Sequence, residues 1–169
     1  MTKPASKSAR RTPALFFYGS LMDRRFWRSV IGARGAASLR MTEARLRGWR
    51  RCWNGMRPDL GGAVLNLKRD PKGFLWGGVV LGLSEAAWAK LDEQESSHLP
   101  RSRVLVVTAR GRRVWAYCYR QRVNGPEGWP GARYLRAVRG GAKAMGRTAS
   151  RDVEADVARL RALIGSTRG

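Results

Sequence analysis

Two pairs of β-rich runs, each pair interrupted by turn residues, constrain the fold of this 169-residue chain more than any other feature. The first pair flanks Asp70-Pro71-Lys72-Gly73, and the second surrounds Gly111. Proline and glycine favour chain reversal, so each pair predicts a hairpin. Because the strands do not strictly alternate with helices, we expect an α+β domain with a small, mixed, curled sheet and flanking helices. The runs are Gly61 to Leu67, Phe74 to Leu83, Arg103 to Ala109 and Arg112 to Tyr119.

Helical patterns lie outside these hairpins. Ser84 is a good N-cap for a helix that runs to about Glu95 or Ser96. Apolar residues at helical spacing between Tyr134 and Met145 predict a further helix, and Ser150 is expected to cap the last one. Other expectations are a short helix at Arg24 to Ile31 closed by Gly32, strand-like pieces in residues 36–53 around Gly48, a loop at Asn54 to Pro58, and an apolar stripe of Val153, Val157, Leu160 and Ile164 on the last helix.

The length suits one domain, which we place at residues 13–165, after a loose basic arm at residues 1–12. Cys52 and Cys118 show neither disulfide nor metal spacing and indicate buried thiols in a reducing, cytoplasmic location. His98 is the one histidine, so no metal site is expected. No apolar run is long enough to span a bilayer.

Charge is the unusual feature of the composition, with 34 Lys+Arg against 12 Asp+Glu and a net charge of +22. Such a surface attracts nucleic acid, anionic lipid or anionic small molecules. Arginine outnumbers lysine, which also fits an arginine-rich proteome in which basic surfaces carry no functional message. Both interpretations stay open at this point.

The apolar run Ala14 to Phe17 leads directly into Tyr18-Gly19-Ser20-Leu21. This pattern predicts a short buried strand that ends in a tight turn before a helix. Successive N–H groups in such a turn form a cradle for a negatively charged oxygen. The alternative is a plain strand-to-helix connection.

The helix after Ser84 places a carboxylate on its apolar face. With Trp88 at 0°, Leu91 lies at about 300° and Glu95 at about 340°, whereas Glu93 points away at about 140°. Burial of Glu95 raises its pKa towards neutrality, which suits a group that takes and returns a proton. The alternative is that the helix frays and Glu95 pairs with an arginine in a structural ion pair.

These residues together resemble the γ-glutamylcyclotransferase-like superfamily, which includes AIG2-like proteins. Tyr18-Gly19-Ser20-Leu21 resembles its N-terminal loop, and Leu91-Asp92-Glu93-Gln94-Glu95 is similar to its Leu-Asp-x-x-Glu helix, which carries the catalytic glutamate. The resemblance covers roughly residues 14–164, and its specificity comes from the joint order and spacing of the motifs. The further matches are Trp53-Asn54, Gly62-Ala63, Trp76-Gly77-Gly78-Val79, Tyr134-Leu135 and Gly141-Ala142.

The resemblance implies a small mixed barrel and a lyase or acyltransferase reaction that needs no metal or cofactor. A γ-glutamyl compound would cyclise to 5-oxoproline and release an amino acid or amine. Glu95 would carry the proton, and Tyr134 would reach the substrate with its hydroxyl. Tyr117 is a weaker candidate, and for either tyrosine a place in the core is an alternative. The residues implied to line the substrate site are Leu15, Phe16, Phe17, Tyr18, Gly19, Ser20 and Leu21.

The chain departs from the family pattern after Glu95. Many relatives continue with Gly and an aromatic residue, whereas this chain has Ser96-Ser97-His98-Leu99-Pro100. His98 is either a second proton carrier or, as we favour, a lone loop histidine. The leaving group stays open among glutathione-type, amino-acid and amine substrates. The second hypothesis for function is a non-catalytic protein of the same fold that binds nucleic acid or another polyanion.

Overall fold

The computed structural model describes residues 13–95, 101–122 and 125–166, and in this part of the chain five strands form a closed barrel accompanied by four α-helices. The strand order is β1-β3-β2-β4-β5. The α+β prediction with a curled, mixed sheet is therefore confirmed. The strands are β1 (Ala14–Phe17), β2 (Met41–Arg57), β3 (Gly62–Val80), β4 (Arg101–Thr108) and β5 (Arg113–Tyr119). The helices are α1 (Arg24–Ser38), α2 (Glu85–Glu95), α3 (Ala132–Met145) and α4 (Arg147–Ser166).

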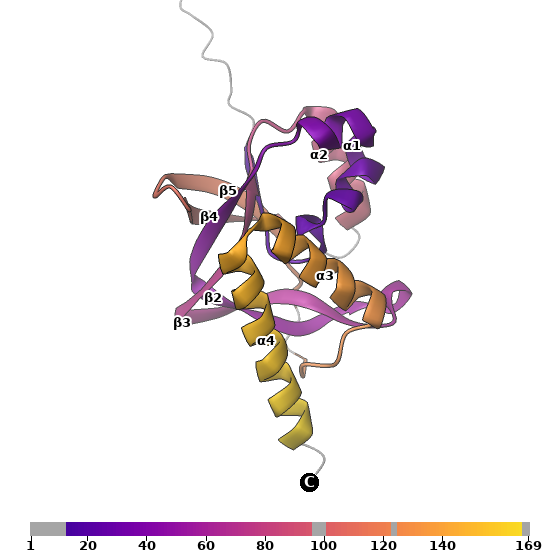
Figure 1. Ribbon diagram of the computed structural model, residues 1–169, viewed down its shortest axis with the longest axis vertical. Coiled ribbons are helices and arrows are strands. Elements are labelled where there is room, and N and C mark those ends of the chain that lie inside the picture. Colours follow the sequence, from indigo (N-terminus) through magenta and orange to yellow (C-terminus); the bar gives the residue numbers. More distant parts are fainter. Residues whose placement is uncertain (1–12, 96–100, 123–124, 167–169) are drawn as a thin grey trace, which may run out of the picture.

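The helices cover the barrel from two sides. Figure 1 shows α1 and α2 packed together near one end, while α3 and α4 lie across β2 and β3. No helix among the described residues is long and apolar enough to cross a membrane. The proposed basic arm, residues 1–12, lies outside the described residues, so the division into arm and domain stays a prediction.

The short strand β1 closes the barrel. It runs antiparallel to β3, with Leu15 opposite Val80, and parallel to β5, with Leu15 opposite Tyr117. All residues of β1 are buried, which explains why the run is continuously apolar instead of alternating. As predicted, a tight turn follows β1, the 3-10 turn η1 (Ser20–Met22).

The predicted turn at Asp70-Pro71-Lys72-Gly73 is wrong as a hairpin. These residues form a bulge inside the long strand β3, because Arg69 pairs with Trp49 while Phe74 pairs with Arg47 on the same partner strand β2. The local turn chemistry is real, since the Lys72 N–H donates to Asp70 Oδ1 at 3.2 Å. It does not reverse the chain, because both flanks keep pairing with β2.

The chain reverses instead at the 3-10 turn η2 (Pro58–Leu60), which joins β2 to β3. The loop predicted at residues 54–58 is therefore wrong, since β2 continues to Arg57. The second hairpin, β4 with β5, is confirmed. This long β2–β3 hairpin brings Arg57 and Leu60 to the end of the barrel at which β1 ends.

Two helix boundaries differ from the prediction. Gly32, with φ of 74°, interrupts the helical backbone as expected, but the chain resumes a helix after this kink and α1 ends at Ser38. The last helix begins at Arg147, before Ser150. Its first turn is capped by a distant side chain, because the Ala149 N–H donates to Glu43 Oε1 at 2.9 Å. A cap supplied by the tertiary structure replaces the serine cap that local sequence favours.

One arginine is wholly inside the protein. Arg51 on β2 is 0% exposed and pairs with Asp152 at 2.5 Å and Asp156 at 3.1 Å, both on α4. Its Nε–H donates to the Tyr18 carbonyl oxygen at 3.0 Å, and it also donates to the Trp76 carbonyl. A buried guanidinium requires such partners because the desolvation of a charge is costly. Arg51 thereby joins α4, the barrel and the turn after β1.

Candidate active site

A cavity opens at the end of the barrel where β1 finishes. The space between its walls is about 560 Å³, a figure that includes open solvent. Its walls come from the turn after β1, the tip of the β2–β3 hairpin, the end of α2, the segment after β5, and α3. The lining residues are Phe16, Phe17, Tyr18, Gly19, Ser20, Leu21, Arg57, Leu60, Val64, Leu65, Glu95, Tyr119, Gln121 and Tyr134.

Glu95 is the last residue of α2 and lies half-buried in this wall. Ser84 precedes the helix as its N-cap, and its hydroxyl accepts the Ala87 N–H at 3.1 Å. Trp88 and Leu91 bury the same face, which turns the Glu95 carboxyl into the cavity. Burial raises the pKa of Glu95 above its ordinary value, and the nearby Arg57 guanidinium partly opposes this effect. A raised pKa makes the carboxylate a stronger base, which suits a group that accepts a proton and releases it again.

The turn after β1 has every carbonyl of residues 18–21 engaged by the protein. The Tyr18 oxygen accepts from Arg51, and the Leu21 oxygen accepts from the Trp27 indole N–H at 2.8 Å. Within the turn, Met22 N–H donates to the Gly19 oxygen at 3.0 Å, and Asp23 N–H donates to the Ser20 oxygen at 2.9 Å. In a trans peptide the N–H of one residue points opposite to the carbonyl of the residue before it. The amides of Gly19, Ser20 and Leu21 are therefore directed away from these internal donors, and their residues line the cavity.

Tyr134 of α3 brings its hydroxyl to the same turn. The hydroxyl oxygen accepts the Leu65 N–H at 3.1 Å and a hydrogen bond from the Ser20 side chain. Burial raises the pKa of Tyr134 to about 12, so the phenol stays protonated. A Cβ at Gly19 would lie 3.2 Å from this oxygen, so a side chain there would crowd the phenol. Tyr134 is thus a fixed polar group in the wall, held at an edge-to-face contact with Trp53.

Two residues implied by the family resemblance lie outside the cavity wall. Leu15 is 0% exposed and packs in the core, because its neighbours on β1 and β3 enclose it. Tyr117 on β5 is half-buried elsewhere, with its ring at the edge of Trp88 and beneath the guanidinium of Arg101. Tyr117 was expected either to contact the substrate or to pack in the core, and these ring contacts fit the packing role. His98 lies outside the described residues.

Several wall residues were not expected from the sequence. Arg57 was missed because residues 54–58 were assigned to a loop, and Tyr119 because it ends a strand without any motif. The Tyr119 hydroxyl donates to Asp92 Oδ1 at 2.7 Å, and Asp92 also pairs with Arg101 at 2.8 Å. The missed residues are Arg57, Leu60, Val64, Leu65, Tyr119 and Gln121.

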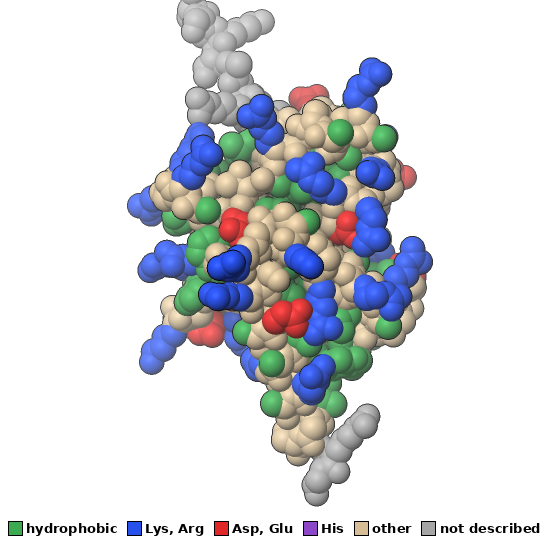
Figure 2. Space-filling view, in the orientation of Figure 1, with side chains coloured by type: hydrophobic (Ala, Val, Ile, Leu, Met, Phe, Trp, Pro, Cys, Tyr) green, Lys and Arg blue, Asp and Glu red, His purple; other side chains and the backbone are tan. Residues whose placement is uncertain are grey.

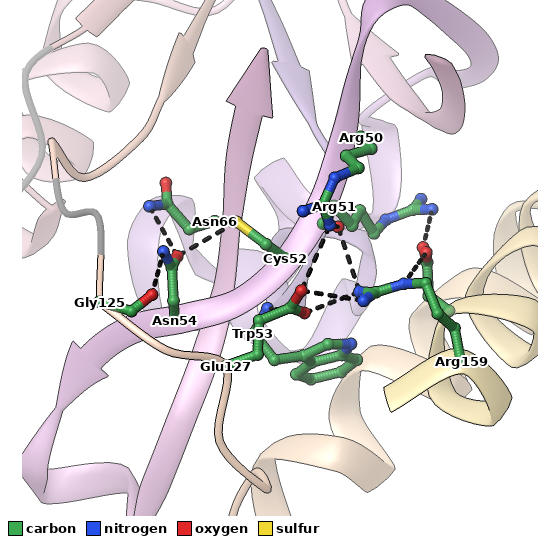
Figure 3. Close-up of polar contacts among 10 residues, drawn as sticks. Arg50, Arg51, Cys52, Trp53, Asn54, Asn66, Gly125, Glu127 and Arg159 are labelled. Atoms are coloured by element: carbon green, nitrogen blue, oxygen red, sulfur yellow. Dashed lines mark hydrogen bonds and ion pairs between the residues drawn. The ribbon is translucent and has the colours of Figure 1, made fainter. Parts of the chain in front are cut away.

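A buried polar network behind the cavity fixes its back wall (Figure 3). The Cys52 thiol donates to Asn54 Oδ1 at 3.1 Å, and the Asn66 side-chain amide donates to the same oxygen at 3.1 Å. Asn66 in turn accepts the N–H of Gln121, a wall residue, at 3.0 Å. The network therefore connects β2 and β3 to the segment after β5, and it leaves Cys52 as a buried free thiol.

Glu127 is the carboxylate next to this network, and it accepts hydrogen bonds from two arginines. Arg159 donates to it at 2.7 and 2.9 Å, and Arg50 at 3.3 Å (Figure 3). Its Oε2 also accepts the Trp53 N–H at 3.0 Å. Residues 13–95, 101–122 and 125–166 contain no cluster of His, Cys, Asp and Glu that could hold a metal ion. The polar side chains of the cavity wall are instead one carboxyl, one guanidinium, three phenols, the Ser20 hydroxyl and the Gln121 carboxamide.

The sequence of this chain also matches a known protein family. Residues 15–136 match the family described as gamma-glutamyl cyclotransferase, AIG2-like. No curated protein sequence matches the chain.

Solved structures share the fold at low identity. One described as gamma-glutamyl cyclotransferase is 20% identical with a TM-score of 0.71, covering 88% of this chain and 86% of its own. A Homo sapiens protein described as uncharacterized is 21% identical with a TM-score of 0.72, over 85% and 86% of the two chains. YkqA from Bacillus subtilis is 20% identical with a TM-score of 0.75, over 92% of this chain and 56% of its own.

Proposed function

Because the chain belongs to the gamma-glutamyl cyclotransferase, AIG2-like family, we propose that it cleaves a γ-glutamyl bond by cyclisation. The products are 5-oxoproline and a free amino acid or amine. The observation that carries the proposal is that the Glu95 carboxyl and the turn containing Gly19, Ser20 and Leu21 line one small cavity. A proton carrier and donors for a developing oxyanion are what this reaction requires.

The first step is activation of the substrate's own α-amino group. Near neutral pH this group is largely an ammonium, so it must lose a proton before it can attack. The Glu95 carboxylate takes that proton, and the raised pKa of Glu95 makes the transfer less uphill. The free amine then attacks the γ-carbonyl carbon and forms a five-membered ring with a negatively charged oxygen.

The second step is collapse of this intermediate. The oxyanion is stabilised by the main-chain amides of the turn and by the hydroxyl groups beside them. As the bond from the γ-carbon to the leaving nitrogen breaks, the protonated Glu95 returns its proton to that nitrogen. The attacking nitrogen carries two hydrogens after ring formation, so it passes its second proton to the emptied Glu95 carboxylate, and the released amine takes up that proton as an ammonium. The reaction is therefore a lyase-type cleavage through an internal acyl transfer.

Because the nucleophile and the carbonyl belong to one molecule, binding the substrate in a folded conformation contributes much of the rate. The apolar wall residues Phe16, Leu60 and Val64 exclude water from the reacting atoms. Tyr134 and Ser20 form a hydrogen-bonded pair beside the turn and help to hold the γ-glutamyl group.

The test is formation of 5-oxoproline from glutathione and a panel of γ-glutamyl amino acids and amines. We expect turnover of at least one class, and loss of about 100-fold or more in kcat for Glu95→Gln. The matched control is Glu93→Gln on the same helix, because Glu93 is exposed and outside the cavity. Absence of 5-oxoproline across the panel, or equal rates for Glu95→Gln and wild type, would refute the proposal.

The second hypothesis, polyanion binding, receives no support from the family or from the similar structures. Figure 2 shows Lys and Arg side chains spread over the visible face and not gathered into one patch. Retention on heparin with a steep salt dependence is the measurement that would favour it. The cytoplasmic location likewise stays a prediction, based on the free buried thiols of Cys52 and Cys118.

A further inference from the structure

The charge of the cavity is carried by two side chains that influence one another. Among the described residues of the wall, Arg57 is the basic side chain and Glu95 is the acidic one. The guanidinium of Arg57 is close enough to Glu95 to lower that carboxyl's pKa. A γ-glutamyl amino acid carries two carboxylates, one on the glutamyl head and one on the leaving group. The wall therefore offers one cation to two anionic groups.

The orientation of Arg57 is fixed by its neighbours. Asp59 accepts two hydrogen bonds, from Nε at 3.0 Å and from Nη2 at 3.0 Å. Both bonds use one edge of the guanidinium and leave Nη1 for another acceptor. The preceding residue on β2, Met56, is held in place as well. Gln121 accepts the Met56 N–H at 2.7 Å and donates to the Met56 carbonyl at 3.1 Å. Arg57 is thus held before any ligand arrives.

The location of Arg57 indicates which carboxylate it meets. It ends β2 at the hairpin tip, with its side chain 27% exposed and its partner Asp59 59% exposed, so it lies at the cavity rim. The main-chain amides that suit the glutamyl head lie in the turn after β1. With the head group in that turn, the leaving group extends from Glu95 towards the rim. Its carboxylate is one carbon away from the leaving nitrogen, which receives its proton from Glu95.

We propose that Arg57 is a specificity-determining residue that binds the carboxylate of the leaving group, so that the substrates are γ-glutamyl amino acids and not simple γ-glutamyl amines. This inference rests on the proposed function and assigns a substrate class to the same cavity. The contact is a charge-assisted hydrogen bond from Nη1, supported by the ion pair with Asp59. Such a bond corresponds to roughly a 10- to 100-fold preference in kcat/KM.

The experiment compares two substrates that differ only by that carboxylate, γ-glutamyl-alanine and γ-glutamyl-ethylamine. For the wild type we expect kcat/KM to favour the alanine compound by roughly 10- to 100-fold. Arg57→Gln should bring the ratio close to one, and Arg57→Lys should restore part of it. The matched control is Arg47→Gln, because Arg47 is exposed on the same strand and outside the cavity.

The ratio separates this role from an effect through Glu95, since a changed Glu95 pKa alters both substrates alike. Equal wild-type values for the two substrates, or a parallel loss of both in Arg57→Gln, would overturn the inference while leaving the cyclotransferase proposal intact. If no compound of the whole γ-glutamyl panel yields 5-oxoproline, the proposed function fails. Calorimetric binding of the same two compounds then decides the role of Arg57, and equal affinity or no binding would overturn it.

Discussion

Replacing Arg51 by methionine tests the reasoning about the buried ion-pair network. The change removes a fully buried guanidinium that bonds to Asp152 and Asp156 on α4 and to the carbonyls of Tyr18 and Trp76. Asp152 and Asp156 are only 22% and 19% exposed, so both would lose their main counter-charge while still largely removed from water. The perturbation therefore leaves unpaired charges as well as lost hydrogen bonds.

Breaking a buried ion pair from one side costs about 3–5 kcal/mol. For a domain of this size each kcal/mol lowers Tm by about 2–4 °C, so we expect a decrease of about 6–20 °C. Urea unfolding and a thermal melt at pH 7 measure both quantities. The control is Arg139→Met, because the Arg139–Glu154 pair is 39% and 52% exposed and should contribute at most about 1 kcal/mol.

The pH dependence provides a second check on the same variant. Burial raises the pKa of Asp156 and Arg51 opposes this effect, so removal of Arg51 raises that pKa further. The deficit of Arg51→Met should therefore shrink as the pH falls from 7 to 4 and Asp156 takes up a proton. A loss below about 1.5 kcal/mol at pH 7, or a deficit that is independent of pH, would refute the account. If the variant does not fold, Arg51→Lys tests the weaker loss of the fixed geometry towards Tyr18.

Three further outcomes follow from the titrating and hydrogen-bonded groups. Glu95 has a raised pKa in the folded state, so its ionisation weakens the fold as pH rises through that pKa, and Glu95→Gln should raise Tm at pH 8 but not at pH 4. Tyr134→Phe removes the acceptor of the Leu65 N–H and should cost about 1–3 kcal/mol in urea unfolding, together with a lower kcat. Burial raises the pKa of Glu127, but hydrogen bonds from Arg159 outweigh this and lower it overall. Its stabilisation is therefore present above the unfolded pKa and lost as pH falls, so the stability gap between wild type and Glu127→Gln, about 1–3 kcal/mol at pH 7, should close towards pH 3.

Local patterns predicted the elements that carry the candidate site. The apolar run before Gly19 indicated a buried strand that ends in a turn, and the structure has β1 followed by η1. The stripe of Trp88, Leu91 and Glu95 placed a carboxyl on the buried face of α2, and that carboxyl lies in the cavity wall. These predictions succeed because the 3.6-residue period and the continuity of apolar residues reflect burial within a single element.

The errors arose where local chemistry allowed two long-range outcomes. Asp70-Pro71-Lys72-Gly73 suits either a hairpin turn or a bulge, and the choice was decided by continued pairing of β3 with β2. Residues 54–58 have loop-like composition, yet residues 54–57 extend β2, where Gln121, far away in sequence, bonds to both main-chain groups of Met56. Such partners leave no periodic signal near the residues that they stabilise.

The sequence by itself determined the family, the α+β class and the two segments that supply the carboxyl and the main-chain amides, since each depends on residues close together in the chain. Only the tertiary structure decided that Arg57 and Glu95 line one cavity and that Arg51 holds the Tyr18 carbonyl. Both arrangements join residues more than thirty positions apart, brought together by barrel closure. Their energetic value depends on burial and relative orientation, and these arise only when the strands and helices pack.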